Sequence, residues 1–352
     1  MNNHILKSLH ESAKNELLDV YSSYKPGRIV AQYNHVYRIA CQEGVILCEM
    51  SGKLKFNCLS EEDYPAVGDW TAISIRPEND RGTIHGVLPR KSKFSRLSAG
   101  TEPNQQLIAV NIDYIFIVLS LNQDFNIRRI ERYLISVWES GATPVIILNK
   151  SDLCGDLPHR LEQLNSACMG VPVIITSALQ SSGYMQVFDY LKEGMTGVFA
   201  GSSGVGKSTL INLLLGDQIQ EVSDIRADDG KGKHTTTHRE LFALKNGAYI
   251  IDIPGMREFG LWESDKGFSE SFRDIEDLSH SCFYNDCAHK HEPDCAVLEA
   301  IRNGSLEKER LANYHKLQRE QEYLTRKNHK AKKAQEKNKH KKIAKEAKSF
   351  KK

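Results

Sequence analysis

The chain has 352 residues, of which 40% are hydrophobic and 26% are charged, a composition typical of globular proteins. Its length predicts two or three domains, and no apolar run approaches the ~20 residues that a membrane span requires. The formal net charge of +2 hides an asymmetry, because residues 326–352 carry +11 and the residues before them carry −9. An acidic body with a basic tail predicts a polyanionic partner, most simply RNA.

Residues 1–26 are predicted to form an N-terminal helical extension. Apolar residues recur there at helical spacing: Ile5, Leu6, Leu9, Ala13 and Leu17. The same segment lacks the uninterrupted apolar stretch and the small-residue cleavage site of a secretory signal. We therefore expect a cytoplasmic protein that does not bind membranes.

Residues 27–100 are predicted to form a small β-barrel. Five short apolar stretches, at 27–34, 35–41, 44–50, 69–76 and 82–88, are separated by turn signals such as Gly44, Gly52 and Gly68. Five strands in about seventy residues favour an OB-fold. The exit segment 88–96 contains four basic residues and Phe94, which is typical of a contact with RNA backbone and bases. A basic linker is the alternative.

Residues 101–262 show a different pattern, long apolar strands that alternate with helices. Strands are expected at 114–121, 144–149, 171–177 and 197–201, with helices at 127–140, 158–168, 183–193 and 207–215, and the segment 247–255 closes the series. Nearly continuous apolar strands between helices indicate a mostly parallel sheet that is covered on both faces. We expect a central α/β domain.

The second of these strands ends in the sequence Asn149-Lys150-Ser151-Asp152. NKxD is the tetrapeptide with which GTPases recognise guanine, and the Asp152 carboxylate can accept hydrogen bonds from N1–H and the exocyclic amine of the base. The next strand ends in Thr176-Ser177-Ala178-Leu179, where a base-cradling Ser-Ala segment belongs. Both segments lie at strand ends, where open α/β sheets bind ligands.

A phosphate-binding loop follows about fifty residues later. The sequence GSSGVGKST matches G-x-x-x-x-G-K-[ST] between an apolar strand and a helix. Its glycines allow backbone N–H groups to approach phosphate, Lys207 can reach the β- and γ-phosphates, and Ser208 can bind Mg²⁺. The loop comprises Gly201, Ser202, Ser203, Gly204, Val205, Gly206, Lys207, Ser208 and Thr209.

The Mg²⁺ side of a GTPase site requires an aspartate at a strand end and a threonine in a switch loop. Asp252 of DIPG, which ends at Gly255, supplies the aspartate. The polar segment 228–240 has the composition of a switch loop, and we assign Thr236 as its Mg²⁺ ligand, with Thr235 and Thr237 as alternatives. The predicted cofactors are GTP or GDP with Mg²⁺.

The catalytic machinery is incomplete for rapid hydrolysis. Met256 follows DIPG, where many GTPases carry a glutamine that orients the attacking water. We therefore expect slow intrinsic turnover that a partner stimulates. His234 is the candidate for the missing polar group, and an ordinary loop histidine is the alternative.

The motifs occur in the order base recognition, Ser-Ala segment, phosphate loop, threonine switch, DIPG. All five GTPase elements are present, but their order differs from that of an ordinary GTPase. NKSD and TSAL, which usually come after DIPG, here come before the phosphate loop. We interpret this order as a circular permutation, in which strands keep their positions while their connections change. The segment after DIPG then runs directly into the C-terminal region.

Residues 263–325 are predicted to form a helical zinc-binding domain. The spacing Cys282-x4-Cys287-x-His289-x5-Cys295 supplies three thiolates and one imidazole, a set suited to one tetrahedral Zn²⁺. His291 competes with His289 as the nitrogen ligand. The other five cysteines are scattered along the chain, and disulfides are not expected. Residues 326–352 form the basic tail, either an RNA-binding segment or a solvated extension.

Together these features resemble the ribosome small-subunit-dependent GTPase A family. The resemblance covers residues 27–320 and rests on the motif order NKSD, TSAL, GSSGVGKS, KHTTT and DIPG, the Cys/His spacing, and segments such as 111–134 and 282–297. It implies a monomeric assembly factor that binds the 30S subunit and its 16S rRNA late in maturation, with GTP hydrolysis stimulated by the subunit and coupled to release. DIPG stands where DTPG is usual in the family.

Two other functions are compatible with parts of the sequence. A passive RNA-binding scaffold would use the nucleotide only for stability, but it would not need Ser208, Thr236 and Asp252 together. A GTPase of membrane or protein traffic would leave the barrel and the basic tail unexplained, and the chain shows no lipidation motif. We therefore favour a GTPase switch that acts on ribosome assembly.

Overall fold

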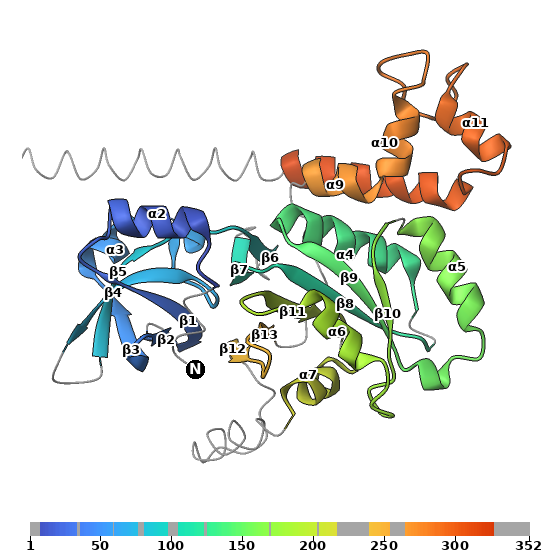
Figure 1. The fold of residues 1–352 in the computed structure, drawn as a ribbon. Helices are drawn as coiled ribbons and strands as arrows, with labels where there is room; N and C mark the ends of the chain where they lie inside the picture. Colours follow the sequence, from blue (N-terminus) through green and yellow to red (C-terminus); the bar gives the residue numbers. More distant parts are fainter. Residues whose placement is uncertain are drawn as a thin grey trace, which may run out of the picture.

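A computed structural model of the chain describes residues 8–33, 36–58, 60–76, 81–97, 105–122, 125–168, 170–202, 204–216, 239–253 and 265–326. A barrel, an α/β region and a C-terminal helical region follow one another along the chain (Figure 1). Within these ranges no helix combines the length and the apolar character needed to cross a membrane.

The N-terminal strands close into a five-stranded barrel, as the sequence predicted. The strands are β1 (Lys25–Tyr33), β2 (Val36–Cys41), β3 (Gly44–Met50), β4 (Trp70–Arg76) and β5 (Arg81–Val87). They follow the order β1-β2-β3-β5-β4, and β1 also pairs with β4, so the barrel has no free edge at that point. Between β3 and β4 lie α3 (Gly52–Asn57) and η2 (Glu61–Asp63).

The N-terminal helix α2 (Glu11–Asp19) lies over the barrel (Figure 1). Leu9 and Ala13 are buried in the same core as the barrel residues Trp70 and Ile73, and Leu17 packs against that core. Ile5 and Leu6 lie outside the described residues.

The α/β region contains five parallel strands with helices on both faces. The strands β8 (Tyr114–Ser120), β9 (Thr143–Asn149), β10 (Val173–Ile175), β11 (Thr196–Ala200) and β13 (Tyr249–Asp252) are arranged in the order β10-β9-β8-β11-β13. The helices α4 (Ile127–Ser140) and α5 (Leu157–Ala167) cover one face, and α6 (Val187–Tyr190) and α7 (Lys207–Leu215) cover the other (Figure 1). The predicted helix at 183–193 is shorter, because η4 (Tyr184–Gln186) precedes α6.

One strand that the sequence did not suggest joins the barrel to the α/β region. The strand β12 (Glu240–Ala243) pairs antiparallel with β13 on one side and with β1 on the other, which makes a single eleven-stranded sheet. The buried Arg28 side chain of β1 reinforces this junction. It donates to Thr196 Oγ1 of β11 at 2.7 Å, and its guanidinium lies 4.9 Å from the centre of the Tyr249 ring of β13.

The expectation that segment 88–96 contacts RNA through Phe94 is wrong. Phe94 is fully buried in β6 (Lys93–Leu97), which pairs with β7 (Gln105–Val110) in a separate two-stranded sheet. Arg90 is also turned inward, where it donates to both carboxylate oxygens of Asp69 at 2.6 and 2.7 Å. This segment therefore anchors the chain as it leaves the barrel.

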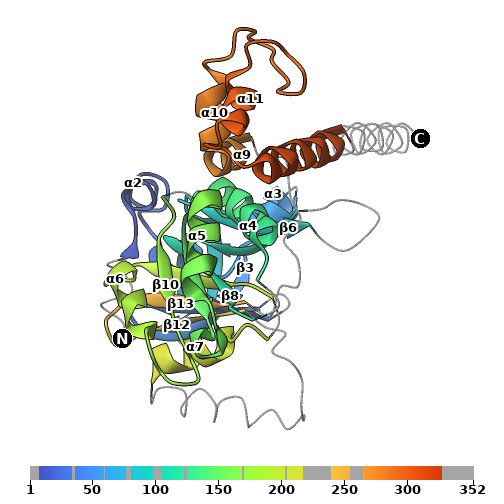
Figure 2. The ribbon, with the colours of Figure 1, turned by 90° about the vertical axis from the view of Figure 1, so that its right-hand side faces the viewer.

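The C-terminal region docks on α4. It contains α9 (Asp265–Ser271), α10 (Arg273–Ser279), α11 (Ala296–Arg302) and a helix over residues 308–326, and it lies against α4 in both views (Figures 1 and 2). Ile135 of α4 belongs to its apolar core. Buried charges complete the contact, since Arg310 binds Glu131 of α4 and also donates to Asp274 at 2.8 Å.

We expect Arg310→Met to lower the free energy of unfolding by about 3 kcal/mol, because it leaves the buried Glu131 carboxylate without its cation. Arg132→Met removes a bidentate ion pair with Glu320 whose side chains are 29% and 32% exposed, and it should cost about 1 kcal/mol or less. Urea unfolding of the purified proteins measures both values. If both variants lost the same free energy of unfolding, the buried pair of Arg310 and Glu131 would stabilise the protein no more than the exposed pair.

Candidate functional site

The predicted nucleotide motifs meet at one edge of the sheet. The strands β9, β10, β11 and β13 are parallel, so their carboxyl ends lie together. NKSD begins at the last residue of β9, TSAL follows β10, the phosphate loop follows β11, and Asp252 is the last residue of β13. The edge therefore brings together segments that are about a hundred residues apart in the chain.

Asn149 is the side chain that joins these loops. It is 1% exposed, and its amide nitrogen donates to the carbonyl oxygen of Val205 in the phosphate loop at 2.7 Å. Its amide oxygen accepts from the Thr176 hydroxyl at 3.1 Å and from the Ala178 backbone N–H at 3.0 Å. The sequence predicted Asn149 as a residue of the base pocket. The structure shows that it also holds the phosphate loop and the TSAL segment in place.

The two base-recognition segments are cross-linked to each other. The Ser151 N–H donates to the Thr176 carbonyl oxygen at 3.1 Å, and the Ser177 hydroxyl donates to Asp152 Oδ1 at 2.5 Å. Lys150 adopts a left-handed backbone with φ of 62°, which turns the chain sharply after the strand. Asp152 is exposed at this turn, so its carboxylate is accessible to a base.

The phosphate loop has the backbone geometry that its glycines predict. Gly201, Gly204 and Gly206 have φ values of 149°, 81° and 98°, a region that other residues rarely adopt. A Cβ atom at Gly206 would lie 2.3 Å from Asn149 Nδ2, and one at Gly201 would lie 2.3 Å from the Val118 carbonyl oxygen. The loop thus has no room for side chains at these two positions.

Lys207 lies at the start of α7 with its ammonium group directed into the loop. It donates to the carbonyl oxygens of Gly201 at 2.8 Å and Ser202 at 2.7 Å. Burial lowers the pKa of Lys207, and the nearby carboxylate of Asp252 opposes that shift. Because an ammonium group has three donors, one remains for a phosphate oxygen.

The residues expected on the Mg²⁺ side also fit their role. Ser208 and Thr209 are exposed in the first turn of α7, after the buried Val205. Asp252 is half-buried at the end of β13, the strand that pairs with β11. Burial lowers the pKa of Lys207, and the negative charge of Asp252 opposes that effect. The Ser208 hydroxyl at the start of α7 and the Asp252 carboxylate at the end of β13 are hard oxygen ligands of the kind that Mg²⁺ prefers.

Several predicted positions lie outside the described residues. They are Ser203, His234, Thr235, Thr236, Thr237, Gly255, Met256 and residues 327–352 of the basic tail. Their assignments rest on the sequence alone.

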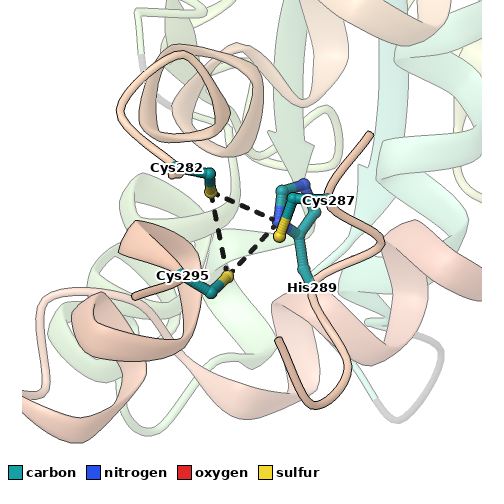
Figure 3. A group of neighbouring side chains, drawn as sticks. All are labelled: Cys282, Cys287, His289 and Cys295. Carbon is teal, nitrogen blue, oxygen red and sulfur yellow. Dashed lines mark hydrogen bonds between the residues drawn. The ribbon is translucent and has the colours of Figure 1, made fainter. Parts of the chain in front are cut away.

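The four predicted zinc ligands form one cluster (Figure 3). Their donor atoms all lie within 4.8 Å of one another. The Sγ atoms of Cys282 and Cys295 are 3.8 Å apart, and His289 Nδ1 lies 3.7 and 3.5 Å from them. A tetrahedral ion with Zn–S bonds of about 2.3 Å and Zn–N bonds of about 2.0 Å requires S–S and S–N separations of about 3.8 and 3.5 Å. The residues therefore fit a zinc ion.

The local backbone explains how these ligands converge. Cys282 follows α10, Cys295 precedes α11, and His289 lies between them with φ of 55°. Glu292 holds the intervening loop by accepting the N–H groups of Lys290, His291 and Ala288, which lowers its pKa to about 2. His289 is 6% exposed, whereas His291 is exposed and lies outside the cluster. The structure thus favours His289, and all eight cysteines are free thiols.

Sequence reasoning missed two contacts that hold the strands of the α/β region in place. The Thr176 hydroxyl of the TSAL segment binds Asn149, a bond that the motif alone does not reveal, and the Arg28 guanidinium binds Thr196 at the start of β11, although Arg28 belongs to no motif. An arginine within the apolar stretch GRIVAQY was the available signal, since a buried cation requires a partner.

Two family models match the chain. A model described as RsgA GTPase matches residues 87–262, and one described as 50S ribosome-binding GTPase matches residues 196–337. The second match begins at the first residue of β11 and includes none of the base-recognition residues, which precede β11 in this chain. This starting point agrees with the permuted order of the motifs.

Curated relatives and solved structures match most of the chain. A small ribosomal subunit biogenesis GTPase RsgA 2 of Lactiplantibacillus plantarum is 45% identical and covers 84% of this chain and 83% of its own. RsgA 1 of Listeria innocua is 45% identical over 92% of this chain and 91% of its own. YjeQ of Thermotoga maritima has a TM-score of 0.63 at 27% identity, covering 84% of this chain and 98% of its own. YloQ, described as a circularly permuted GTPase, shares the fold with a TM-score of 0.61 at 24% identity, covering 85% and 95%.

We expect Gly206→Ala to weaken GDP binding about tenfold or more, because the added methyl group collides with Asn149 and strains a left-handed backbone. Gly155→Ala is the matched control, since nothing lies within 4 Å of a Cβ atom there. A fluorescent GDP analogue measures both affinities. Wild-type binding by the Gly206 variant would show that the loop tolerates a side chain.

Zinc analysis of the purified protein should find one ion per chain. His289→Ala should lose most of it, because three thiolates alone leave the tetrahedron open, while His291→Ala should retain it. Metal content by mass spectrometry decides between the two histidines. Full occupancy in His289→Ala, or loss in His291→Ala, would overturn the ligand set.

Proposed function

The chain belongs to the RsgA GTPase family and is a GTPase, and we propose that it binds the 30S ribosomal subunit and acts late in the maturation of that subunit. Hydrolysis of GTP is stimulated by the subunit and coupled to release of the protein. The observation that supports this proposal most strongly is the extent of the sequence match. Relatives named small ribosomal subunit biogenesis GTPase are 45% identical over up to 92% of the chain, a span that takes in barrel, nucleotide edge and Cys/His cluster.

The proposed nucleotide contacts follow from the loops at the sheet edge. Asn149, Lys150, Ser151 and Asp152 recognise guanine with Ser177 and Ala178, and Gly201 to Thr209 surround the phosphates. Ser208 and Thr236 hold Mg²⁺, with Asp252 and Gly255 on the same side, and Lys207 neutralises charge on the phosphates. The site can therefore bind GTP in a defined orientation.

Hydrolysis is proposed to be slow without a partner. The residue after DIPG is Met256, whose thioether cannot orient a water molecule as a glutamine does. His234 is the residue of this chain that we assign to that task. If hydrolysis requires the ribosomal subunit, GTP is hydrolysed only after the protein has bound that subunit.

The remaining parts of the chain are proposed to serve the same partner. The cluster of Cys282, Cys287, His289 and Cys295 binds one zinc ion and holds the C-terminal region together. The +11 charge of residues 326–352 contacts 16S rRNA, and the protein acts as a monomer in the cytoplasm. The proposed units are residues 1–26, 27–100, 101–262, 263–325 and 326–352.

GTP turnover with purified 30S subunits, with 50S subunits and without either tests this function. We expect 30S subunits to stimulate phosphate release about tenfold or more, because they complete a site that lacks its water-orienting residue. Asp152→Asn is the control, since it should lose the response to GTP and regain it with xanthosine triphosphate. Stimulation by 50S subunits alone, or by neither, would refute the proposed partner.

A further inference from the structure

Four residues of four neighbouring strands lie in one row across the junction between the barrel and the α/β region. Arg38 of β2 is paired with Ala31 of β1, Ala31 with Glu240 of β12, and Glu240 with Asp252 of β13. Neighbouring strands are about 4.8 Å apart, so Ala31 lies about 10 Å from Asp252. The barrel is therefore two strand spacings from the aspartate at the nucleotide edge.

The side chain of Arg38 crosses this row. Its guanidinium lies 3.2 Å from the carboxylate of Glu240, with side-chain exposures of 28% and 23%. Paired residues point to the same face of a sheet, and the small side chain of Ala31 leaves space between Arg38 and Glu240. A cation of the barrel thus neutralises an acid of the α/β region.

Glu240 and Asp252 stand directly opposite each other on antiparallel strands. Like charges in this arrangement repel each other, because their Cβ atoms are about 5 Å apart. The field at Asp252 consequently depends on whether Glu240 is paired with Arg38. The junction itself does not depend on this ion pair, since Arg28 of β1 binds Thr196 of β11 and the backbones of β1 and β12 are paired.

We propose that Arg38 is a positioning residue for the Mg²⁺ side of the GTP site, acting through Glu240 on Asp252. This inference rests on the proposed function, in which Asp252 lies on the Mg²⁺ side of bound GTP. When Arg38 is paired with Glu240, the excess negative charge beside Asp252 is small. When Arg38 is withdrawn, Glu240 adds to that charge and the site attracts a divalent cation more strongly.

Substitutions at the two residues have opposite expected effects on Mg²⁺ affinity. Arg38→Gln leaves Glu240 uncompensated and should tighten Mg²⁺ binding about threefold to tenfold, whereas Glu240→Gln leaves the guanidinium uncompensated and should weaken it by a similar factor. The double variant should return to within about twofold of the wild type, because both charges are removed. Misfolding cannot produce opposite signs in two variants.

The measurement is a titration with MgCl₂ of the full-length protein bound to a fluorescent non-hydrolysable GTP analogue. Lys25→Gln is the matched control, because Lys25 forms an ion pair with Glu43 in the same barrel, and its strand β1 is registered with β12 at Ala31, six residues away. It should leave Mg²⁺ affinity unchanged. Affinity for GDP without Mg²⁺ should stay within about twofold of the wild type in all variants, since Asp252 acts through the cation.

Two results separate this inference from the function on which it rests. If Asp252→Asn leaves Mg²⁺ affinity unchanged, the assignment of Asp252 to the Mg²⁺ side is wrong, and the coupling fails with it. If Asp252→Asn weakens Mg²⁺ binding but the Arg38 and Glu240 variants match the wild type, or the double variant is not restored, only the coupling is overturned.

Discussion

The nucleotide edge depends on one buried amide, the side chain of Asn149. It binds Val205, Thr176 and Ala178, so loops that follow three different strands share a single group. Loss of any of these bonds would leave a buried polar group unpaired, at a cost of about 1–3 kcal/mol. Each bond joins the carboxyl end of β9 to a loop that follows another strand, β10 or β11, and none depends on the order in which the chain enters the strands. For this reason a circularly permuted chain can assemble the whole site.

The permuted order also determines how the C-terminal region is attached. β13, which ends at Asp252, is the last strand along the described part of the chain, and the next described element is α9 of the C-terminal region. That region is held a second time through the contact of Arg310 with Glu131 of α4. α4 follows β8, which is separated from β13 by β11. The C-terminal region is therefore attached at two places, to β13 through the chain and to α4, the helix that follows β8. The strands β8 and β13 lie on either side of β11, which leads into the phosphate loop.

The parts of the molecule that short-range chemistry determines could be predicted from the sequence. The phosphate loop needs glycines at left-handed positions, and the zinc cluster needs four ligands of closely defined spacing, so both are visible in the primary structure. Arg90 and Phe94 could not be predicted in this way. The basic character of segment 88–96 does not reveal that Arg90 forms a buried ion pair with Asp69, which lies 21 residues earlier in the chain. The strand β12 was missed for a similar reason, since its four residues become a strand only between β1 and β13.

The barrel and the C-terminal region are joined to the α/β region by different kinds of contact. The C-terminal region is docked by side chains, through an apolar core that includes Ile135 of α4 and through the ion pair of Arg310 with Glu131. The barrel instead continues the same sheet, although the β1–β12 pairing is short and registers only Ala31 with Glu240. Backbone pairing resists sliding, because a shift of one residue turns every side chain to the other face. In the coupling that we propose, a partner that drew Arg38 away from Glu240 would therefore act on Asp252 through charge and not by sliding the strands.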